Sequence, residues 1–195
     1  MVIAMDVDAF LTRSISELAG RSSWIDWLFL FVSDPDVLWV PGILLGLYWL
    51  WLSPREAVIG GLSLGASIGL LDFIGAQIKH LAARPRPCVS LSELHSLQAC
   101  GKTFSFPSNH AINTATAAAF LHVLYPRSGW ISWPIVALVG IARVYIGAHY
   151  VTDVLGGWMI GGLCGAGIAW LLLQWPQFRQ RVSPIVSMHA DSSAP

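Results

Sequence analysis

Long apolar segments separated by short polar connections dominate the chain. A helix that spans a bilayer needs about 20 predominantly apolar residues, and the connections contain proline or charged residues, which end helices. The pattern therefore predicts an all-α, polytopic transmembrane bundle of about five to six membrane helices. The apolar runs cover residues 37–52, 57–78, 109–125, 130–146 and 151–175.

The first 35 residues follow a different pattern. Residues 5–20 mix apolar and charged positions at roughly helical spacing, which predicts an N-terminal amphipathic helix on the membrane surface. Residues 24–33 are apolar but too short to span a bilayer alone. They form either a short inserted helix or the upper part of a broken first span. We expect no cleaved signal peptide, because Asp6 and Asp8 stand where a basic region would.

Two of the apolar runs carry glycine at every fourth position. Small residues at this spacing form a helix face that lets another helix approach closely. We therefore expect both runs to pack tightly against neighbouring helices. The glycines are Gly61, Gly65 and Gly69 in one run and Gly157, Gly161 and Gly165 in the other.

The direction of the spans brings distant polar residues to one membrane face. We expect the runs 57–78, 109–125, 130–146 and 151–175 to alternate in direction. One membrane face then receives the ends of the first and third runs and the starts of the second and fourth. Ionisable groups inside a membrane are costly and indicate functional sites, so a candidate site is expected here. The residues gathered there are Lys79, Arg86, Ser108, His110, Arg143, His149 and Asp153.

Composition supports a membrane protein without a separate soluble domain. The 195 residues have a mean hydropathy of +0.62 and are 11% charged, about half the charged share of soluble domains. Residues 1–180 are expected to form one membrane-embedded domain, with its motif core at 57–175 and a polar, disordered tail at 181–195. Eleven basic and eleven acidic residues cancel, which argues against nucleic acid as a partner.

Basic turns indicate how the bundle is oriented. Arg55 and Arg127 lie in short turns at the face opposite the candidate site, and the tail adds Arg179 and Arg181. Short basic turns belong on the cytoplasmic side, so the site is expected to face outward. An interfacial aromatic belt is expected at the cytoplasmic level. Its members are Trp49, Trp51, Trp130, Trp133, Trp170 and Trp175.

Two of the three cysteines lie in the long polar connection after residue 78. Cys88 and Cys100 either form a disulfide in an oxidising compartment or remain free thiols. The sequence leaves both readings open, because a disulfide requires Cα atoms about 4.4–6.8 Å apart. Cys164 stands in an apolar run and is read as a small buried residue.

Two polar groups at helix ends suit an anion. Lys79, Arg84 and Arg86 follow a span, and ammonium and guanidinium groups bind phosphate oxygens well. The alternative is an ordinary basic cap of a helix C-terminus. Residues 106–111 (FPSNHA) precede a span, where free backbone N–H groups form an anion site. The alternative there is a plain N-cap.

The third group is Arg143, His149 and Asp153, spaced by six and four residues. Asp153 can accept a hydrogen bond from one ring nitrogen of His149, which leaves the lone pair of the other nitrogen free to attack phosphorus. His110 is then the general acid that protonates the leaving oxygen. The basic residues neutralise charge on the phosphate, the dominant contribution in phosphoryl transfer.

These motifs resemble, in order and spacing, the three signature motifs of the type 2 phosphatidic acid phosphatase superfamily. The motifs are Lys79-x6-Arg86-Pro87, Pro107-Ser108-Asn109-His110 and Arg143-x5-His149-x3-Asp153. The resemblance implies a metal-independent phosphatase with a phosphohistidine on His149, oriented by Asp153, and His110 as the acid. It implies a phosphate site made by Lys79, Arg86, Ser108, Asn109 and Arg143. The chain departs from the family pattern at two positions. It has Asn109 where the family commonly has glycine, and Ala142 where the family commonly has serine.

Small size, the amphipathic start and the outward site resemble the bacterial branch of this superfamily. That resemblance implies a multi-pass protein of the inner (plasma) membrane with its site facing the periplasm or outside. The implied substrate is a phosphorylated lipid, with undecaprenyl diphosphate first and phosphatidylglycerophosphate, phosphatidic acid or lipid A as alternatives. The oligomeric state stays open.

The polar residues also allow other interpretations. Zinc suits the spacing of His149 and Asp153, but the surrounding cations repel a metal ion, so no metal or other cofactor is expected. A lipid-headgroup transporter or scramblase shares the anion site but has no need of an oriented histidine. Asp72, inside a span, either pairs with a basic residue, lines the lipid path or bonds to a neighbouring helix. Arg84 contacts either a second phosphate or lipid headgroups.

Overall fold

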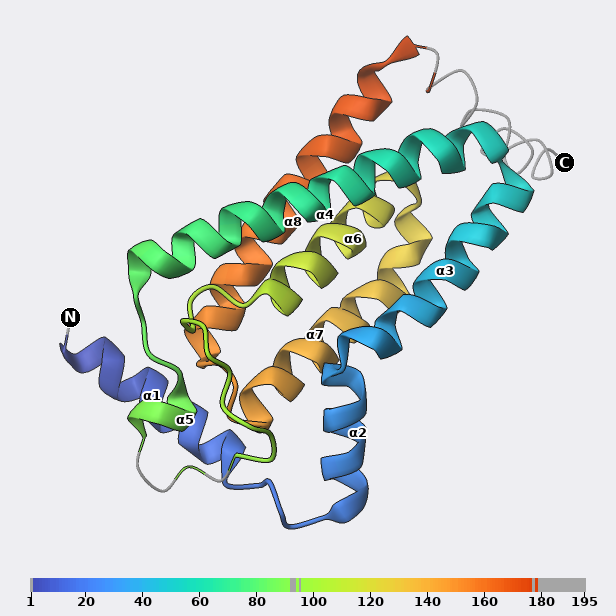
Figure 1. The fold of residues 1–195 in the computed structure, drawn as a ribbon. Coiled ribbons are helices and arrows are strands. Elements are labelled where there is room, and N and C mark those ends of the chain that lie inside the picture. Colours follow the sequence, from blue (N-terminus) through green and yellow to red (C-terminus); the bar gives the residue numbers. More distant parts are fainter. Residues whose placement is uncertain (1, 92–93, 95, 177, 179–195) are drawn as a thin grey trace, which may run out of the picture.

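The chain folds into helices and connections over residues 2–91, 94, 96–176 and 178, which the computed structural model describes. Long helices run alongside one another, and the short helices α1 and α5 gather at one end of the bundle (Figure 1). The all-α class is confirmed, and the long helices begin and end close to the expected positions. They are α1 (Val2–Ser16), α2 (Ser23–Ser33), α3 (Pro35–Leu52), α4 (Pro54–Ala82), α5 (Pro87–Ser90), α6 (Asn109–Leu124), the 3-10 helix η1 (Pro126–Ser128), α7 (Gly129–Tyr145) and α8 (Val151–Gln174).

Membrane-spanning segments form the frame of the protein. Three are long and apolar enough to cross a bilayer: Pro54–Ser90, Pro126–Tyr145 and Val151–Gln174. Ser23–Ser33 and Val40–Leu52 are shorter apolar helices. The alanine-rich α6 packs against α8, α7 and α4, and its alanines at 111, 115, 118 and 119 are buried. This helix therefore lies inside the bundle.

Glycines bring the backbones of α6 and α8 together. A methyl group at Gly157 would lie 2.7 Å from Ala111 Cβ, and methyl groups at Gly161 and Gly165 would overlap backbone carbonyls of α6. The predicted close approach is therefore confirmed for α8. It is wrong for Gly61, Gly65 and Gly69 of α4, because no described residue lies within 4 Å of a methyl group placed there. Glycine spacing identifies a smooth helix face, but not whether a helix of the same chain covers it.

This packing predicts a difference between two adjacent glycines of α8. Gly161→Ala should lower the free energy of unfolding by about 1–3 kcal/mol, because the added methyl group meets the Ile112 carbonyl. Gly162→Ala is the matched control, since no described atom lies within 4 Å of its methyl position. Thermal unfolding midpoints in one detergent measure the difference. Equal midpoints for both variants would show that the two helices do not pack through this face.

Helix α1 turns its polar side toward the protein. Asp8, Thr12 and Ser16 recur every fourth residue and are buried. Ser16 Oγ donates to the Val144 carbonyl (2.8 Å), and Thr12 Oγ1 accepts from the Val151 amide (3.3 Å). The apolar side is outward, with Phe10 67% exposed. The predicted amphipathic helix is confirmed, and its polar side contacts the end of α7 and the start of α8.

Helix α2 is a separate short helix that packs against α7. The chain turns at Asp34, whose side chain caps α3 by accepting from the Asp36 amide (3.0 Å). Residues 24–33 therefore form a helix separate from α3, which fits both a short inserted helix and the first part of a broken span.

A polar contact ties three helices together at the end of the bundle far from α1. Trp49 Nε1 donates to the Tyr125 hydroxyl (2.8 Å), which donates to Glu56 (3.1 Å). Trp49 is therefore engaged inside the protein rather than in an outward aromatic belt. The other expected belt members are exposed, namely Trp51, Trp130, Trp133, Trp170 and Trp175.

Candidate active site

The candidate site lies at the end of the bundle where four helix ends meet, namely the ends of α4 and α7 and the starts of α6 and α8 (Figure 1). α4 stops because Ala83 adopts a left-handed conformation (φ 44°) and the prolines of residues 84–87 cannot continue the helix. The Ser108 amide donates to the Asp153 carbonyl (3.1 Å), which joins the starts of α6 and α8. The helix ends are thus gathered as alternating spans predict.

A tight turn after α7 fixes His149 relative to Arg143. Gly147 adopts a positive φ of 76°, which glycine does without strain. Its amide bonds to the Val144 carbonyl (3.0 Å), and the Ala148 amide bonds to the Arg143 carbonyl (3.1 Å). This pair of bonds is a Schellman motif. The His149 amide also donates to the Arg143 carbonyl (3.2 Å), so both residues belong to one rigid turn.

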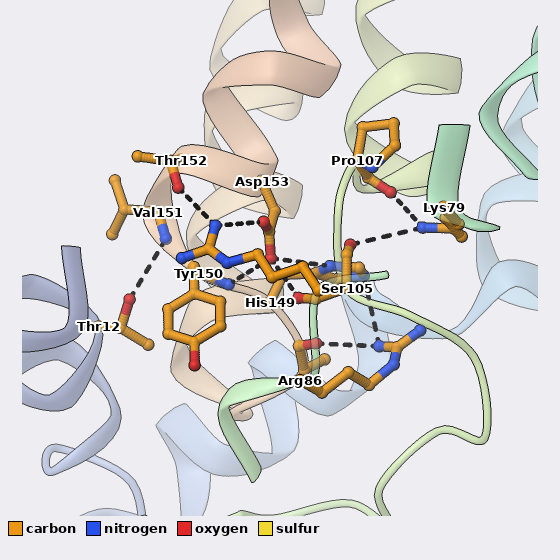
Figure 2. Close-up of polar contacts among 12 residues, drawn as sticks. Thr12, Lys79, Arg86, Ser105, Pro107, His149, Tyr150, Val151, Thr152 and Asp153 are labelled. Carbon is orange, nitrogen blue, oxygen red and sulfur yellow. Dashed lines mark hydrogen bonds and ion pairs between the residues drawn. The ribbon is translucent and has the colours of Figure 1, made fainter. Parts of the chain in front are cut away.

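Asp153 lies beside the His149 ring. His149 Nδ1 is 3.6 Å from Asp153 Oδ2, slightly longer than a hydrogen bond, and both side chains are buried. The same oxygen accepts from the Tyr150 amide (2.8 Å) and from the Ser105 hydroxyl. The other ring nitrogen, Nε2, lies 3.5 Å from an Arg86 guanidinium nitrogen (Figure 2). Asp153 therefore favours a proton on Nδ1 and a lone pair on Nε2.

Burial keeps the His149 ring neutral. Desolvation lowers the pKa of His149 to about 4, although Asp153 opposes this, and nearby cations lower it further. Neutral imidazole is therefore the form present at physiological pH. This is the form that carries a nucleophilic lone pair.

Three cations converge on the site, and they interact electrostatically with one another. Lys79 Nζ donates to the Pro107 carbonyl (Figure 2). Arg86 bonds to the Ala148 carbonyl (2.9 Å), and Arg143 bonds to the Ser33 carbonyl (3.2 Å). Among the described residues these cations bond to neutral oxygens and to none of the carboxylates. The site therefore keeps a positive charge that suits an anion.

Several buried polar atoms around this charge lack a hydrogen-bond partner in the described part of the chain. They are Ser108 Oγ, His110 Nε2 and Arg143 Nε. Both Ser108 and His110 belong to the start of α6, where the first N–H groups also have no partner within the helix. Burying unpaired polar groups is costly, and phosphate oxygens can accept from such donors. The other predicted phosphate contact at this helix start, Asn109, turns its side chain toward α4.

Asn109 bonds to Asp72 on α4. Its amide nitrogen lies 2.9 Å from Asp72 Oδ1, and that of Asn113 lies 3.1 Å from the same oxygen. Asp72 thus bonds to a neighbouring helix, which was one of its three readings. With the side chain of Asn109 directed at α4, only its backbone N–H remains for an anion at the helix start.

Arg84 has a position that the sequence analysis missed. It bonds to Asp153 (2.7 Å) and to Asp8 (2.6 Å), and its guanidinium lies 3.7 Å from the centre of the Tyr150 ring. It therefore contacts protein carboxylates rather than a second phosphate or lipid headgroups. The one available signal was the spacing of Asp8, Thr12 and Ser16, which places polar residues on a single face of α1.

A disulfide closes the connection over the site. Cys88 and Cys100 are bonded, with their Cα atoms 6.0 Å apart, which resolves the open alternative in favour of pairing. Within the closed loop, Ser96 Oγ donates to the Ile146 carbonyl (3.2 Å). The loop therefore lies against the turn that carries His149.

Two further histidines in the described part of the chain lie outside this cluster. His80 contacts the Phe104 ring edge-on, and His122 lies against Gly129 near the far end of the bundle. His95 and His189 lie outside the described residues, as do Arg179, Arg181 and the predicted tail at 181–195.

Known proteins resemble this chain in sequence and fold. A family model described as the PAP2 superfamily matches residues 60–181. An undecaprenyl-diphosphatase of Sulfolobus acidocaldarius is 29% identical over 160 residues, 82% of this chain and 74% of that protein. Undecaprenyl-diphosphatase BcrC of Bacillus subtilis is 28% identical over 162 residues, 78% of each chain. The crystal structure of a transmembrane PAP2 type phosphatidylglycerolphosphate phosphatase from Bacillus subtilis has a TM-score of 0.69 at 24% identity, over 88% of this chain and 87% of that one. This last likeness shows a shared fold.

Proposed function

The chain belongs to the PAP2 superfamily and is a membrane lipid phosphatase, and we propose that it hydrolyses undecaprenyl diphosphate through a phosphohistidine on His149. The observation that carries this mechanism is the arrangement around one buried imidazole. Its Nδ1 lies toward Asp153 and its Nε2 toward Arg86. Three cations lie around it, and among the described residues none of these cations bonds to a carboxylate.

In the first step, Nε2 of His149 attacks the terminal phosphorus of the lipid diphosphate. A phosphorus–nitrogen bond forms, and the bond from phosphorus to the bridging oxygen breaks. The bonding electrons leave with that oxygen, which receives a proton from the imidazolium form of His110, the form that a bound phosphate anion favours. Asp153 stabilises the positive charge that develops on the His149 ring.

The phosphate oxygens are held by groups from three helix ends. Lys79, Arg86 and Arg143 supply positive charge, and Ser108 and the first N–H groups of α6, including that of Asn109, supply hydrogen bonds. These groups stabilise the charge of the transferring phosphoryl group. The chemistry requires no Lewis acid, because the cations already do this, and we propose a metal-independent reaction.

In the second step, water attacks the phosphohistidine. An oxygen–phosphorus bond forms, the phosphorus–nitrogen bond breaks, and the electron pair returns to Nε2 of His149. His110, now neutral, takes a proton from the attacking water. Inorganic phosphate leaves, and the imidazole is ready for another cycle.

The choice of lipid rests on the relatives. Two proteins named as undecaprenyl-diphosphatases match along 82% and 78% of this chain. Phosphatidylglycerophosphate, phosphatidic acid and lipid A are the alternative substrates. No residue of the phosphate site distinguishes these lipids, because all of its groups contact the phosphoryl group or the nucleophile.

A substrate panel tests this choice. Purified protein in detergent is given undecaprenyl diphosphate, phosphatidylglycerophosphate, phosphatidic acid and lipid A in turn, and released phosphate is measured. We expect the highest kcat/KM for undecaprenyl diphosphate, with activity kept in the presence of a chelator. A higher value for another lipid would change the substrate, and inhibition by a chelator with recovery on adding zinc would contradict metal independence. Release from none of the lipids would favour a transporter or scramblase.

We further propose that the site faces the outside of a bacterial inner membrane. The disulfide between Cys88 and Cys100 lies at the site end, and disulfides persist in oxidising compartments. Arg55 and Arg127 lie at the other end of the bundle, where short basic turns favour the cytoplasmic side. Both features support the same orientation.

Thiol labelling of intact cells tests the orientation. In a Cys164→Ala background, Glu17→Cys at the site end should react with a membrane-impermeant maleimide. Arg127→Cys, at the opposite end, should react only after the cells are permeabilised. Both positions are exposed to solvent, so access to the reagent decides the result. The reverse labelling pattern would place the site in the cytoplasm.

A further inference from the structure

The start of α8 is capped by side chains of α1, a helix far away in sequence. Asp8 is only 4% exposed, and its Oδ1 accepts from the Thr152 amide (3.1 Å). Its Oδ2 accepts from the Thr152 hydroxyl (2.5 Å), and Thr12 accepts from the Val151 amide (3.3 Å). The first N–H groups of a helix need such partners, and a carboxylate at this end is favoured by the helix dipole. Figure 2 shows the contact between Thr12 and Val151.

A single guanidinium joins Asp8 to the carboxylate beside the nucleophile. Arg84 Nη2 lies 2.6 Å from Asp8 Oδ2, and Arg84 Nη1 lies 2.7 Å from Asp153 Oδ1. Because the guanidinium is planar and its donors are fixed relative to one another, this bridge sets the separation of the two carboxylates. The Tyr150 ring packs against one face of the Arg84 guanidinium, with the ring centre 3.7 Å from the guanidinium carbon.

The bridge also determines where the second oxygen of Asp153 points. A carboxylate is rigid, so holding Oδ1 against Arg84 fixes the direction of Oδ2. Oδ2 is the oxygen that lies 3.6 Å from His149 Nδ1 and accepts from Ser105. Without Arg84, the described residues hold Asp153 only through the Tyr150 amide and the Ser105 hydroxyl, both at Oδ2, so the carboxylate is free to turn about that oxygen and to change its alignment with the His149 ring.

We propose that Asp8 of α1 is a positioning residue for the nucleophile, acting through Arg84 on Asp153 and through Asp153 on His149. The inference rests on the proposed phosphohistidine mechanism. Asp8 reaches no reacting atom in this role. It supplies the second negative charge that holds Arg84 in the orientation in which Asp153 faces His149.

The role of the Asp8 charge can be separated from the docking of α1. Thr12 and Ser16 attach α1 to α8 and α7 independently of Asp8. Asp8→Asn keeps the shape of the side chain and an oxygen for the Thr152 amide, but removes the charge that faces Arg84. Glu17→Gln is the matched control, because it removes an exposed carboxylate just after the same helix.

Steady-state kinetics on the preferred lipid test the proposal. Asp8→Asn should lower kcat about 10- to 100-fold, the scale of a small displacement of a reacting group, with KM within about twofold of wild type. Arg84→Gln should have an effect of similar size, and the double variant should be no slower than the slower single variant. Glu17→Gln should match wild type. A wild-type kcat in Asp8→Asn, or additive losses in the double variant, would overturn the proposal.

Amide hydrogen exchange separates this inference from the proposed function. If wild-type protein releases no phosphate from any lipid, the function fails, and exchange then decides the positioning role. The amides of residues 149–152 should exchange faster in Asp8→Asn than in Glu17→Gln. Equal exchange in the two variants would show that Asp8 does not hold this segment.

Discussion

Replacing His149 with alanine is expected to lower kcat by at least about 10⁴-fold, the scale seen when a covalent nucleophile is removed. Among the described residues no other histidine lies beside Asp153, because the Schellman turn places the His149 ring there. Phosphate release from the lipid diphosphate measures the loss. Acid-labile labelling of the protein by ³²P-substrate should disappear with it.

His122→Ala is the control for this variant, since His122 is exposed near the opposite end of the bundle and should leave kcat unchanged. Labelling that persists in His149→Ala would assign the phosphoryl group to another residue. Activity that falls less than tenfold would mean that water attacks the phosphate directly, with His149 outside the covalent chemistry.

His110→Ala is expected to lower kcat about 10²- to 10⁴-fold for a lipid diphosphate or monoester, the usual contribution of a general acid. A substrate with a good leaving group, such as an aryl phosphate, needs little protonation and should lose much less. The His110 ring stands in the first turn of α6, and its Nε2 is buried without a partner in the described part of the chain. It is therefore available to a leaving oxygen.

The ratio of rates for the two kinds of substrate measures this role of His110. A loss of equal size for both would argue that His110 binds phosphate rather than donating a proton. Thr114→Val offers a matched change one turn further along α6, where the hydroxyl bonds only to carbonyls of its own helix. It should leave the ratio unchanged.

The sequence predicts the frame of this protein well. Runs of apolar residues give the bounds of the helices α4, α6, α7 and α8 within a few residues, because bilayer thickness limits the length of an apolar run. Alternation of those spans then brings Lys79, Ser108 and His149 to one end without any knowledge of contacts. The roles of these residues stay predictions until the variants above are measured.

The environment of each helix face was harder to predict. Amphipathic periodicity identifies two faces of α1 but not which one meets protein, and here Asp8 and Thr12 turn inward because lipid can satisfy no hydrogen bond. Gly61 and Gly161 share the same spacing pattern, yet only the second meets another helix of the chain. Both outcomes depend on tertiary neighbours that local sequence does not encode.

Individual side-chain partners were also beyond the sequence. Arg84 and Arg86 stand two positions apart in the same proline-rich segment, but Arg84 faces carboxylates and Arg86 faces His149. Whether Cys88 and Cys100 pair depends on how the loop returns toward Ile146. In each case the path of the backbone, rather than the residue type, determines which partner the side chain meets.

The turn that links Arg143 and His149 couples the positions of both residues to the position of α7. Because the Arg143 carbonyl accepts from the amides of both Ala148 and His149, a tilt of α7 should move the His149 ring and the Arg143 guanidinium together. Thermal motion of the helix thus changes their distance from α4 and α6 while preserving their mutual alignment. A one-residue insertion between Arg143 and His149 would break that coupling. Both side chains would remain, but their relative positions would change.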